Sequence, residues 1–310
     1  MLIHHKDQVV YEQYFADSNS HTLHDTRSAT KTVAALLVGI AIHRGEIDSV
    51  HLPVLPFFPD WLPLKNPDRR KAEITLEDFL AMSSKLECND FKAYSRVNEE
   101  RMYVMEDWVQ FTLDLPIKGY APWETKPEAS AFGRSFAYCT AGAYSLGRIV
   151  VRASGTTLPK YTQTHLFDPL GIEKVEWPRT SLGRASTAGG IRLSTRSLMK
   201  LGMLYLANGS AGDKRILFEG WVQQSLKTHV NIDDDTEYGY LIWKRNLQIG
   251  EKSITIHWMS GNGGNHVAII PDLDLVIVLT KTAYNQRDAH MTSRRLIDEV
   301  VLPVFLSAGM

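Results

Sequence analysis

The chain has 310 residues, of which 44% are hydrophobic and 22% charged, a composition that supports a large core in one or two domains. Because 34 Lys and Arg residues nearly balance 35 Asp and Glu residues, the net charge of −1 argues against nucleic acid as a partner. The longest apolar run, residues 33–42, is too short for an integral membrane segment. The two cysteines, Cys88 and Cys139, are too few for a disulfide framework and lack the paired spacing of a zinc site.

The first third of the chain predicts a hairpin followed by a buried helix. Residues 2–15 alternate around a polar turn at Lys6 and Asp7, which indicates two strands. This start offers no apolar stretch or cleavage site, so we expect no signal peptide. Residues 28–44 are apolar almost all round and end at Gly45, which predicts a buried helix with Ser28 at its N-terminus.

The middle of the chain is predicted to be mostly helical. Prolines between residues 52 and 67 indicate an irregular crossing. Residues 74–80 then predict a helix capped by Thr75 with Asp78 three residues later, and helical signal continues to about residue 170, through residues 106–113 and 140–153.

The last third returns to strand patterns at residues 240–248, 253–259, 266–270 and 275–280, with turn signals at Gly250 and at residues 272–274. This order predicts an α/β chain of the α+β type, with a mixed sheet flanked by helices. We expect residues 1–60 and 175–310 to form a sheet-containing domain and residues 61–174 a helical insertion domain, with a cleft between them.

Ser28 and Lys31 are the first candidate catalytic pair. Three residues apart at a helix start, a hydroxyl and an amine lie on the same face and within reach of each other. A buried lysine there loses its proton more readily, and the neutral amine can then accept the serine proton. The alternative is a purely structural role, in which Ser28 caps the helix and Lys31 is exposed. The following helix, however, offers almost no polar face for an ammonium group.

Two further segments fit the same chemistry. Tyr138 stands just before the helix at 140–153, where a phenol could relay a proton to a leaving group, although a half-buried core tyrosine is the ordinary alternative. The glycine-rich residues 261–264 precede a strand, where a backbone N–H could point at a developing oxyanion, although a hairpin turn would also use glycine.

Taken together, these motifs resemble a known family over nearly the whole chain. The motifs are Arg-Ser-Ala-Thr-Lys at 27–31, Ile-Thr-Leu at 74–76, Tyr-Cys-Thr at 138–140, Leu-Phe-Asp-Pro-Leu-Gly-Ile at 166–172 and Gly-Asn-Gly-Gly at 261–264. In this order they resemble the serine beta-lactamase and penicillin-binding-protein group. That group includes class C beta-lactamases, D-alanyl-D-alanine carboxypeptidases, family VIII esterases and 6-aminohexanoate-dimer hydrolases. The resemblance implies the beta-lactamase/transpeptidase-like fold, with a mainly antiparallel sheet.

The resemblance also implies roles for individual residues. Ser28 looks like the acylated nucleophile, Lys31 like its general base, and Tyr138 like the group that passes the proton to the leaving group. The backbone N–H groups of Ser28 and Asn262 would form the oxyanion hole, in which one donor is worth about 3 kcal/mol. No metal and no cofactor is implied.

The chain departs from the family pattern in the substrate-binding motifs. Thr140 stands where the beta-lactamases have the Asn of Tyr-x-Asn, and residues 259–261, Met-Ser-Gly, stand where they have Lys-Thr-Gly. Thr140, Ser260 and Gly261 are therefore the expected substrate-binding residues. His257, two residues before Met259 on the same strand face, is a candidate substitute for the missing lysine, although a lone strand histidine is more often structural.

These departures favour esters, small amides or peptides over beta-lactams, and neutral acyl groups over charged ones, because we find no cation in place of the lysine. A catalytically inactive binding or scaffolding relative is the alternative. Residues 86–104 and 178–190 are expected to line the cleft, and Trp123, Trp177 and Trp258 are either an apolar wall or core. The family resemblance suggests a periplasmic or secreted protein, although no signal peptide is recognised.

Overall fold

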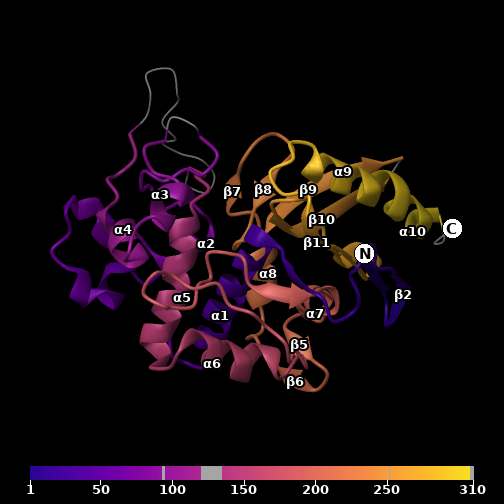
Figure 1. Cartoon of the computed structure of the whole chain (residues 1–310), viewed down its shortest axis with the longest axis horizontal. Coiled ribbons are helices and arrows are strands. Elements are labelled where there is room, and N and C mark those ends of the chain that lie inside the picture. Colours follow the sequence, from indigo (N-terminus) through magenta and orange to yellow (C-terminus); the bar gives the residue numbers. More distant parts are fainter. Residues whose placement is uncertain (93–94, 120–134, 251, 308–310) are drawn as a thin grey trace.

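The computed structural model describes residues 1–92, 95–119, 135–250 and 252–307. Its centre is an eight-stranded sheet in the order β2-β1-β12-β11-β10-β9-β8-β7, and all pairings in it are antiparallel. The first and last parts of the chain are therefore neighbours, since β1 pairs with β12. This confirms the expected sheet flanked by helices (Figure 1).

The strands of this sheet are β1 (Leu2–His5), β2 (Gln8–Glu12), β7 (Val230–Asn231), β8 (Glu237–Tyr238), β9 (Trp243–Ile249), β10 (Lys252–Gly261), β11 (Asn265–Ile270) and β12 (Leu275–Leu279). Two small two-stranded sheets are formed by β3 (Leu23–Asp25) with β4 (Arg192–Ser194), which are far apart in the chain, and by β5 (Ser210–Ala211) with β6 (Lys214–Arg215). The expected N-terminal hairpin is confirmed. The strand predicted at 240–248 begins only at Trp243, because Leu241 has a left-handed φ of 52°.

The α-helices are α1 (Thr32–His43), α2 (Leu76–Leu80), α3 (Glu99–Tyr103), α4 (Trp108–Asp114), α5 (Thr140–Ser154), α6 (Leu158–Thr162), α7 (Thr195–Leu206), α8 (Trp221–Leu226), α9 (Ala289–Arg295) and α10 (Leu302–Ser307). Short 3₁₀ turns are η1 (Arg27–Lys31), η2 (Leu55–Phe57), η3 (Pro59–Trp61), η4 (Arg69–Glu73) and η6 (Pro271–Leu273), and π turns are η5 (Gln163–Phe167) and η7 (Leu296–Val301). The capping box of Thr75 and Asp78 at α2 is present as predicted.

Both faces of the sheet are covered. Along β11, Val267 and Ile269 pack into the core shared with α1, α5 and α7, whereas Ala268 and Ile270 pack into a second core with η7 and α10. Successive side chains of a strand point to opposite faces, so this alternation follows from a strand that is apolar throughout. Figure 1 shows α9 and α10 on one side of the sheet and the helical block of α2–α5 beyond its other side.

The buried helix predicted at residues 28–44 is confirmed, with one difference. Its first turn, η1, is a 3₁₀ turn, and the α-helix proper begins at Thr32. Gly45 ends it with a φ of 71°, as its sequence position predicts. Since α1 packs against α5, one core joins the two predicted domains, and the division of the chain into residues 1–60 with 175–310 and 61–174 stays a prediction.

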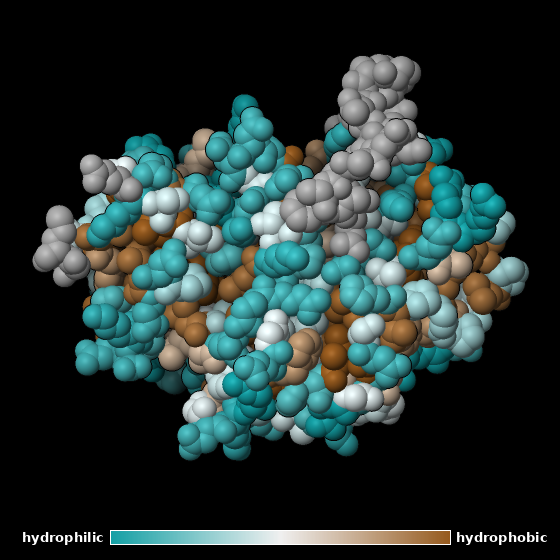
Figure 2. Space-filling view, turned by 180° about the vertical axis from the view of Figure 1, so that it is seen from behind, coloured by the Kyte–Doolittle hydropathy of each residue, from teal (hydrophilic) through white to brown (hydrophobic). Residues whose placement is uncertain are grey.

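Exposed apolar side chains gather where the chain ends meet. Val9, Val10 and Tyr11 of β2 and Val300 and Val304 near the C-terminus are each more than 40% exposed. They belong to the end of the molecule that carries β2 and α10, where brown side chains are visible from behind (Figure 2). Among the described residues, no helix is both long and apolar enough to cross a bilayer.

Candidate active site

Ser28 and Lys31 lie together on the short turn η1. The Lys31 Nζ donates a hydrogen bond of 2.6 Å to the Ser28 Oγ. The lysine is only 2% exposed, so its amine faces the serine with almost no water around it. The arrangement matches the geometry that the sequence spacing predicts. A nucleophile and a base in direct contact can exchange the serine proton.

A second segment fixes the carbonyl of Arg27, the residue before Ser28. The Gly190 N–H donates to the Arg27 carbonyl oxygen at 2.8 Å, and the Thr30 hydroxyl donates to the same oxygen at 3.2 Å. Gly189 passes so close that an added Cβ would lie 2.9 Å from that oxygen, and its φ of +113° also requires glycine. Residues 178–190 were expected to line the cleft, but this buttress of the nucleophile turn was not foreseen.

The end of β10 lies against the other side of the same turn. A Cβ on Gly261 would lie 1.8 Å from the Thr26 carbonyl oxygen, so the two backbones are in direct contact. The Asn262 side chain is locked to Asn285, because its Nδ2 donates to the Asn285 Oδ1 at 2.6 Å and its Oδ1 accepts from the Asn285 N–H at 2.8 Å. Ser28 and Asn262 both line one cavity, while the direction of their N–H groups as an oxyanion hole stays a prediction.

Tyr138 is buried beside the lysine. It is 5% exposed, and the Lys31 Nζ lies 5.2 Å from the centre of its ring. The ring stacks with Phe91, at 4.5 Å, and with Trp243, at 5.8 Å, and those two rings are themselves 6.4 Å apart, so the three form one aromatic cluster. Tyr138 is thus held rigidly next to the base, and its role as a proton relay stays a prediction.

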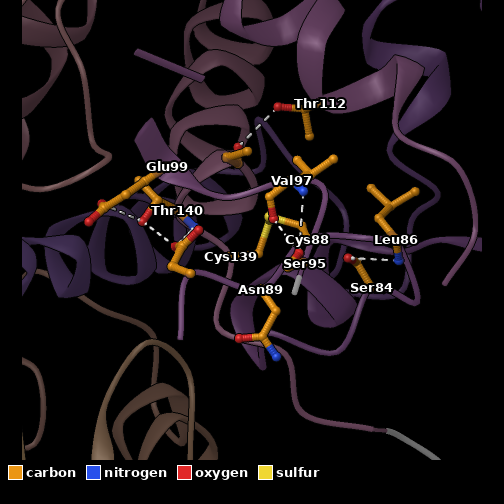
Figure 3. Close-up of a disulfide and its surroundings, with 12 residues drawn as sticks. Ser84, Leu86, Cys88, Asn89, Ser95, Val97, Glu99, Thr112, Cys139 and Thr140 are labelled. Atoms are coloured by element: carbon orange, nitrogen blue, oxygen red, sulfur yellow. Dashed lines mark hydrogen bonds between the residues drawn. A yellow bond between two sulfur atoms is a disulfide. The ribbon is translucent and has the colours of Figure 1, made fainter. Parts of the chain in front are cut away.

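The Thr140 hydroxyl is hydrogen-bonded to two acidic side chains. The N–H and the hydroxyl of Thr140 approach the Asp90 Oδ2 at 2.8 Å and 2.7 Å, and the hydroxyl also lies 3.1 Å from the Glu99 Oε2 (Figure 3). A threonine hydroxyl has one proton, so the two carboxyl groups compete for it. Burial raises the pKa of Asp90 to about 6, although the hydrogen bond from Thr140 and the charge of Lys31 act in the opposite direction.

The two cysteines, which we judged too few for a disulfide framework, form a disulfide beside Thr140. Cys88 and Cys139 are bonded (Figure 3). The Asp90 N–H donates to the Tyr138 carbonyl oxygen at 2.9 Å. The segment of Asp90 is therefore joined to the Tyr138–Thr140 segment covalently and by hydrogen bonds.

His257 is a buried residue of the sheet. It is 6% exposed, and its neighbour across the strands on β9 is Lys244. Burial, and then the charge of Lys244, lower the pKa of His257 to about 4, so its ring is neutral at pH 7. Met259 is 1% exposed, and Ser260 pairs in register with His266. Neither His257 nor Thr140 is among the described residues that line the cavity at Ser28.

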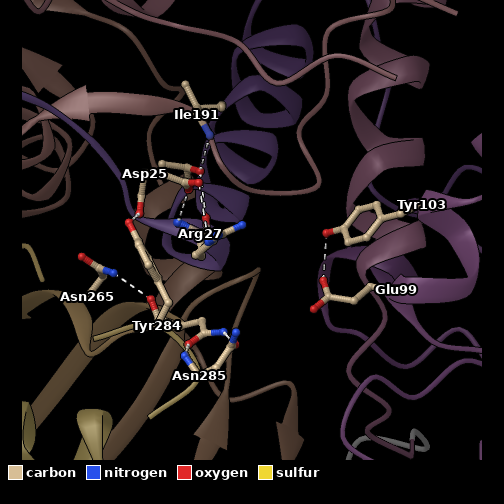
Figure 4. Close-up of polar contacts among 10 residues, drawn as sticks. Asp25, Arg27, Glu99, Tyr103, Ile191, Asn265, Tyr284 and Asn285 are labelled. Carbon is tan, nitrogen blue, oxygen red and sulfur yellow. Dashed lines mark hydrogen bonds and ion pairs between the residues drawn. The ribbon is translucent and has the colours of Figure 1, made fainter. Parts of the chain in front are cut away.

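This cavity has a volume of about 340 Å³. Arg27, Ser28 and Asn285 line one part of it, and Glu99 and Tyr103 of α3 line another. Figure 4 shows Arg27 and the Glu99–Tyr103 pair on opposite sides of an open space. The expected lining by residues 86–104 and 178–190 is met by Glu99 and Tyr103 from the first range and by Pro178, Ser186 and residues 188–190 from the second, but the roles of the charged side chains were not predicted.

Two of the tryptophans that we considered as an apolar wall of the cleft do not line the cavity. Trp258 is 2% exposed and belongs to the second core, and Trp177 packs partly buried against the first. Trp123 lies outside the described residues. The tryptophan that does line the cavity is Trp108 of α4.

Within the described ranges, no group of three His, Cys, Asp or Glu side chains is arranged to hold a metal ion.

The sequence of the chain is similar to those of known proteins. A sequence profile of the family described as Beta-lactamase matches residues 1–300. The chain is 24% identical over 236 residues to the 6-aminohexanoate-dimer hydrolase of Paenarthrobacter ureafaciens, a match that covers 73% of this chain and 56% of that protein. The chain thus spans little more than half the length of this relative.

Solved structures share the fold at low sequence identity. A provisional 6-aminohexanoate-dimer hydrolase from Bacillus anthracis is similar with a TM-score of 0.76 and 16% identity, over 98% of this chain and 78% of that one. The D-stereospecific amidohydrolase from a Streptomyces species is similar with a TM-score of 0.66 and 15% identity, over 96% and 92% of the two chains.

Proposed function

Because the chain belongs to the beta-lactamase family, whose named relatives are hydrolases, we propose that it is a serine hydrolase that forms an acyl-enzyme on Ser28. The observation that carries the proposal is the 2.6 Å contact between the Ser28 Oγ and the buried amine of Lys31. A lysine that served only as a surface charge would face water instead.

In the proposed reaction, the amine of Lys31 takes the proton of Ser28 while the Oγ attacks the carbonyl carbon of the substrate. The oxyanion of the tetrahedral intermediate accepts hydrogen bonds from the backbone N–H groups of Ser28 and Asn262. The bond to the leaving group then breaks, and the leaving group receives the proton from Lys31 through the Tyr138 hydroxyl. Water repeats these steps in reverse roles and releases the acid.

We propose linear esters and amides as the substrates, with weak or no activity on beta-lactams. Proteins with the same fold carry the names 6-aminohexanoate-dimer hydrolase and D-stereospecific amidohydrolase, which supports a linear substrate. In this chain Met259 is buried where a beta-lactamase has the lysine of Lys-Thr-Gly, and the Thr140 hydroxyl is engaged by Asp90 and Glu99. Both facts support a substrate preference unlike that of a beta-lactamase.

The proposal is tested by intact-mass spectrometry after incubation with a fluorophosphonate probe. We expect one adduct on the wild type and none on Ser28→Ala, with slow labelling of Lys31→Ala. Ser186→Ala is the matched control, because Ser186 is another buried serine that lines the same cavity, and it should label like the wild type.

Turnover is then measured with p-nitrophenyl butyrate and with nitrocefin. We expect hydrolysis of the ester and little or none of nitrocefin. A folded wild type that gains no adduct and hydrolyses neither compound would refute the proposal and favour an inactive binding relative.

A further inference from the structure

Both polar atoms of the Asn262 side chain are held by one residue, Asn285. The Asn262 Nδ2 donates to the Asn285 Oδ1 at 2.6 Å, and the Asn285 N–H donates to the Asn262 Oδ1 at 2.8 Å. The Asn262 carbonyl oxygen accepts from the Asn265 Nδ2 at 2.7 Å. Within the described part of the chain the Asn262 N–H makes no hydrogen bond, and Asn262 lines the cavity of Ser28, so this N–H is the backbone group that remains for a ligand.

The loop that carries Asn262 has little stiffness of its own. Gly261, Gly263 and Gly264 surround Asn262 in the chain, and the last two have left-handed φ angles of 91° and 79°. Glycine gives the backbone more conformations than any other residue, so the N–H groups of such a loop point in many directions unless other contacts restrict them. An oxyanion hole, in contrast, works because its donors are aimed before the reaction begins. The contacts around Asn262 therefore decide whether its N–H can serve as such a donor.

Residues 281–285, the segment after β12, close around this loop. The Lys281 N–H donates to the Asn265 Oδ1 at 2.8 Å, and Asn265 is 0% exposed. A Cβ on Gly263 would lie 2.9 Å from a ring carbon of Tyr284, so this ring packs directly on the loop. Together with the two bonds from Asn285, these contacts restrict the loop along its whole length.

The same segment also contacts the turn that carries Ser28. The Tyr284 hydroxyl donates to the Asp25 carbonyl oxygen at 2.7 Å, and the guanidinium carbon of Arg27 lies 4.7 Å from the centre of the Tyr284 ring (Figure 4). The Asp25 Oδ1 in turn accepts from the Arg27 N–H at 2.9 Å. Tyr284 and Asn285 therefore connect the two segments whose backbone N–H groups we assign to the oxyanion hole.

We propose that Asn285 is a positioning residue of the oxyanion hole, which holds Asn262 so that its N–H points at the oxyanion of the tetrahedral intermediate. The inference rests on the proposed serine-hydrolase function and adds a residue to the same site. Asn285 acts through Asn262 and needs no contact with the substrate. Its φ of 60° is left-handed, a conformation that asparagine adopts more readily than most residues do.

Two single variants remove the contact from either side. Asn285→Gly deletes the acceptor of the Asn262 Nδ2, and glycine adopts a φ of 60° without strain. Asn262→Ala deletes the side chain that Asn285 holds but keeps the backbone N–H of residue 262. For both variants we expect kcat for p-nitrophenyl butyrate to fall about tenfold and KM to change less than about twofold, because a poorly aimed donor weakens binding of the transition state more than binding of the substrate.

Propylboronic acid provides a second measurement that depends on the oxyanion hole. The Ser28 Oγ adds to its boron while the serine proton passes to Lys31, and the product is a tetrahedral boronate anion that resembles the tetrahedral intermediate of a butyrate ester. We expect the inhibition constant to rise by the same factor as kcat falls, about tenfold, in both variants. A residue that only stabilised the fold would lower the melting temperature without this parallel change.

The double variant and a matched control complete the test. Asn262→Ala/Asn285→Gly should be no slower than the slower single variant, because both changes remove the same contact. The control is Asn208→Gly. Asn208 is also an asparagine with a left-handed φ, of 50°, and its Oδ1 accepts from the Gln223 Nε2 at 2.9 Å, but it is not among the described residues that line the cavity. This variant should keep the wild-type kcat and inhibition constant.

The outcomes separate this inference from the proposed function. If the wild type hydrolyses the ester but Asn285→Gly keeps the wild-type kcat and inhibition constant, or if the losses of the single variants multiply in the double variant, the role of Asn285 is refuted while the hydrolase function stands. A rise in KM alone would mean that Asn285 contacts the substrate directly, and it would refute the role as well. If no ester is hydrolysed and Ser28 is not labelled, the hydrolase function fails and the inference fails with it. Should Asn285→Gly not fold, Asn262→Ala decides the question by the same two measurements.

Discussion

Replacing Gly261 by alanine should separate the two halves of the proposed oxyanion hole. In the structure, the added Cβ would lie 1.8 Å from the Thr26 carbonyl oxygen and 2.9 Å from the Ala29 nitrogen, whereas real Cβ contacts are essentially never shorter than 3.0 Å. Both neighbours are backbone atoms, so no side chain can swing away. The end of β10 and the turn η1 must therefore move apart by the difference, about 1.2 Å.

A shift of this size is large on the scale of catalysis. Misplacing reacting groups by about 1 Å can cost about 100-fold in rate, and losing one oxyanion-hole donor costs about 100- to 1000-fold. We expect Gly261→Ala to slow the labelling of Ser28 by fluorophosphonate, and kcat/KM for p-nitrophenyl butyrate, by about 100-fold or more. The strain should lower the free energy of unfolding by only about 1–3 kcal/mol, the usual cost of overpacking.

The assay measures both rate constants together with thermal unfolding by circular dichroism. Gly119→Ala is the control, because an added Cβ at Gly119 meets no heavy atom of the described residues within 4 Å and its φ is not in the left-handed region. If Gly261→Ala folds and labels within threefold of the wild type, the close contact of β10 with the nucleophile turn does not position the reacting groups, and our assignment of Asn262 to the oxyanion hole would be wrong.

Three further predictions concern groups around the site. The double variant Cys88→Ala/Cys139→Ala removes a disulfide between residues 51 apart, so the free energy of unfolding should fall by about 3–4 kcal/mol. Labelling of Ser28 should also slow. Thermal melts and mass spectrometry check these two results, with the oxidised wild type as the reference. The pKa of Asp90 in the folded protein is raised to about 6 from its ordinary 3.8, so ionising Asp90 destabilises the fold as pH rises from 4 to 7. Asp90→Asn cannot ionise. Over this pH range its free energy of unfolding, measured by urea melts, should therefore rise by about 2–3 kcal/mol relative to that of the wild type. The pKa of His257 is lowered to about 4, so the free energy of unfolding of the wild type should fall as pH drops from about 6.5 to 4. For His257→Leu this fall should be smaller by up to about 3 kcal/mol. Equal pH dependence of the two proteins would contradict this.

Local chemistry in the sequence predicted much of the framework. The spacing of Ser28 and Lys31 depends on one helical turn, and the structure brings their reactive atoms to 2.6 Å. The cap at Thr75 and the glycine end at Gly45 depend on neighbouring residues in the same way. Such features are visible in a sequence because the atoms that interact are only a few residues apart.

The residues that surround the candidate pair were hidden for the opposite reason. Asp90 and Glu99 meet Thr140 from positions 50 and 41 residues away, and the disulfide spans 51 residues. Nothing in the composition near Asp90 marks it as a partner of Thr140. His257 was judged from its strand position alone, whereas its environment is set by Lys244 on the neighbouring strand and by burial. Contacts of this kind are decided by tertiary packing, which a single sequence does not reveal.

The two departures from the family motifs have different structural consequences. Thr140 does not leave a gap where an asparagine would stand, because its hydroxyl recruits two acids from outside the motif and so brings negative charge towards Lys31 and the cavity. Met259 does leave the end of β10 without a charge, and among the described residues that line the cavity the one cation is Arg27, on the nucleophile turn, which is paired with Asp25. Asp25 and Glu99 line the same cavity, so its lining carries two acidic side chains for this one cation.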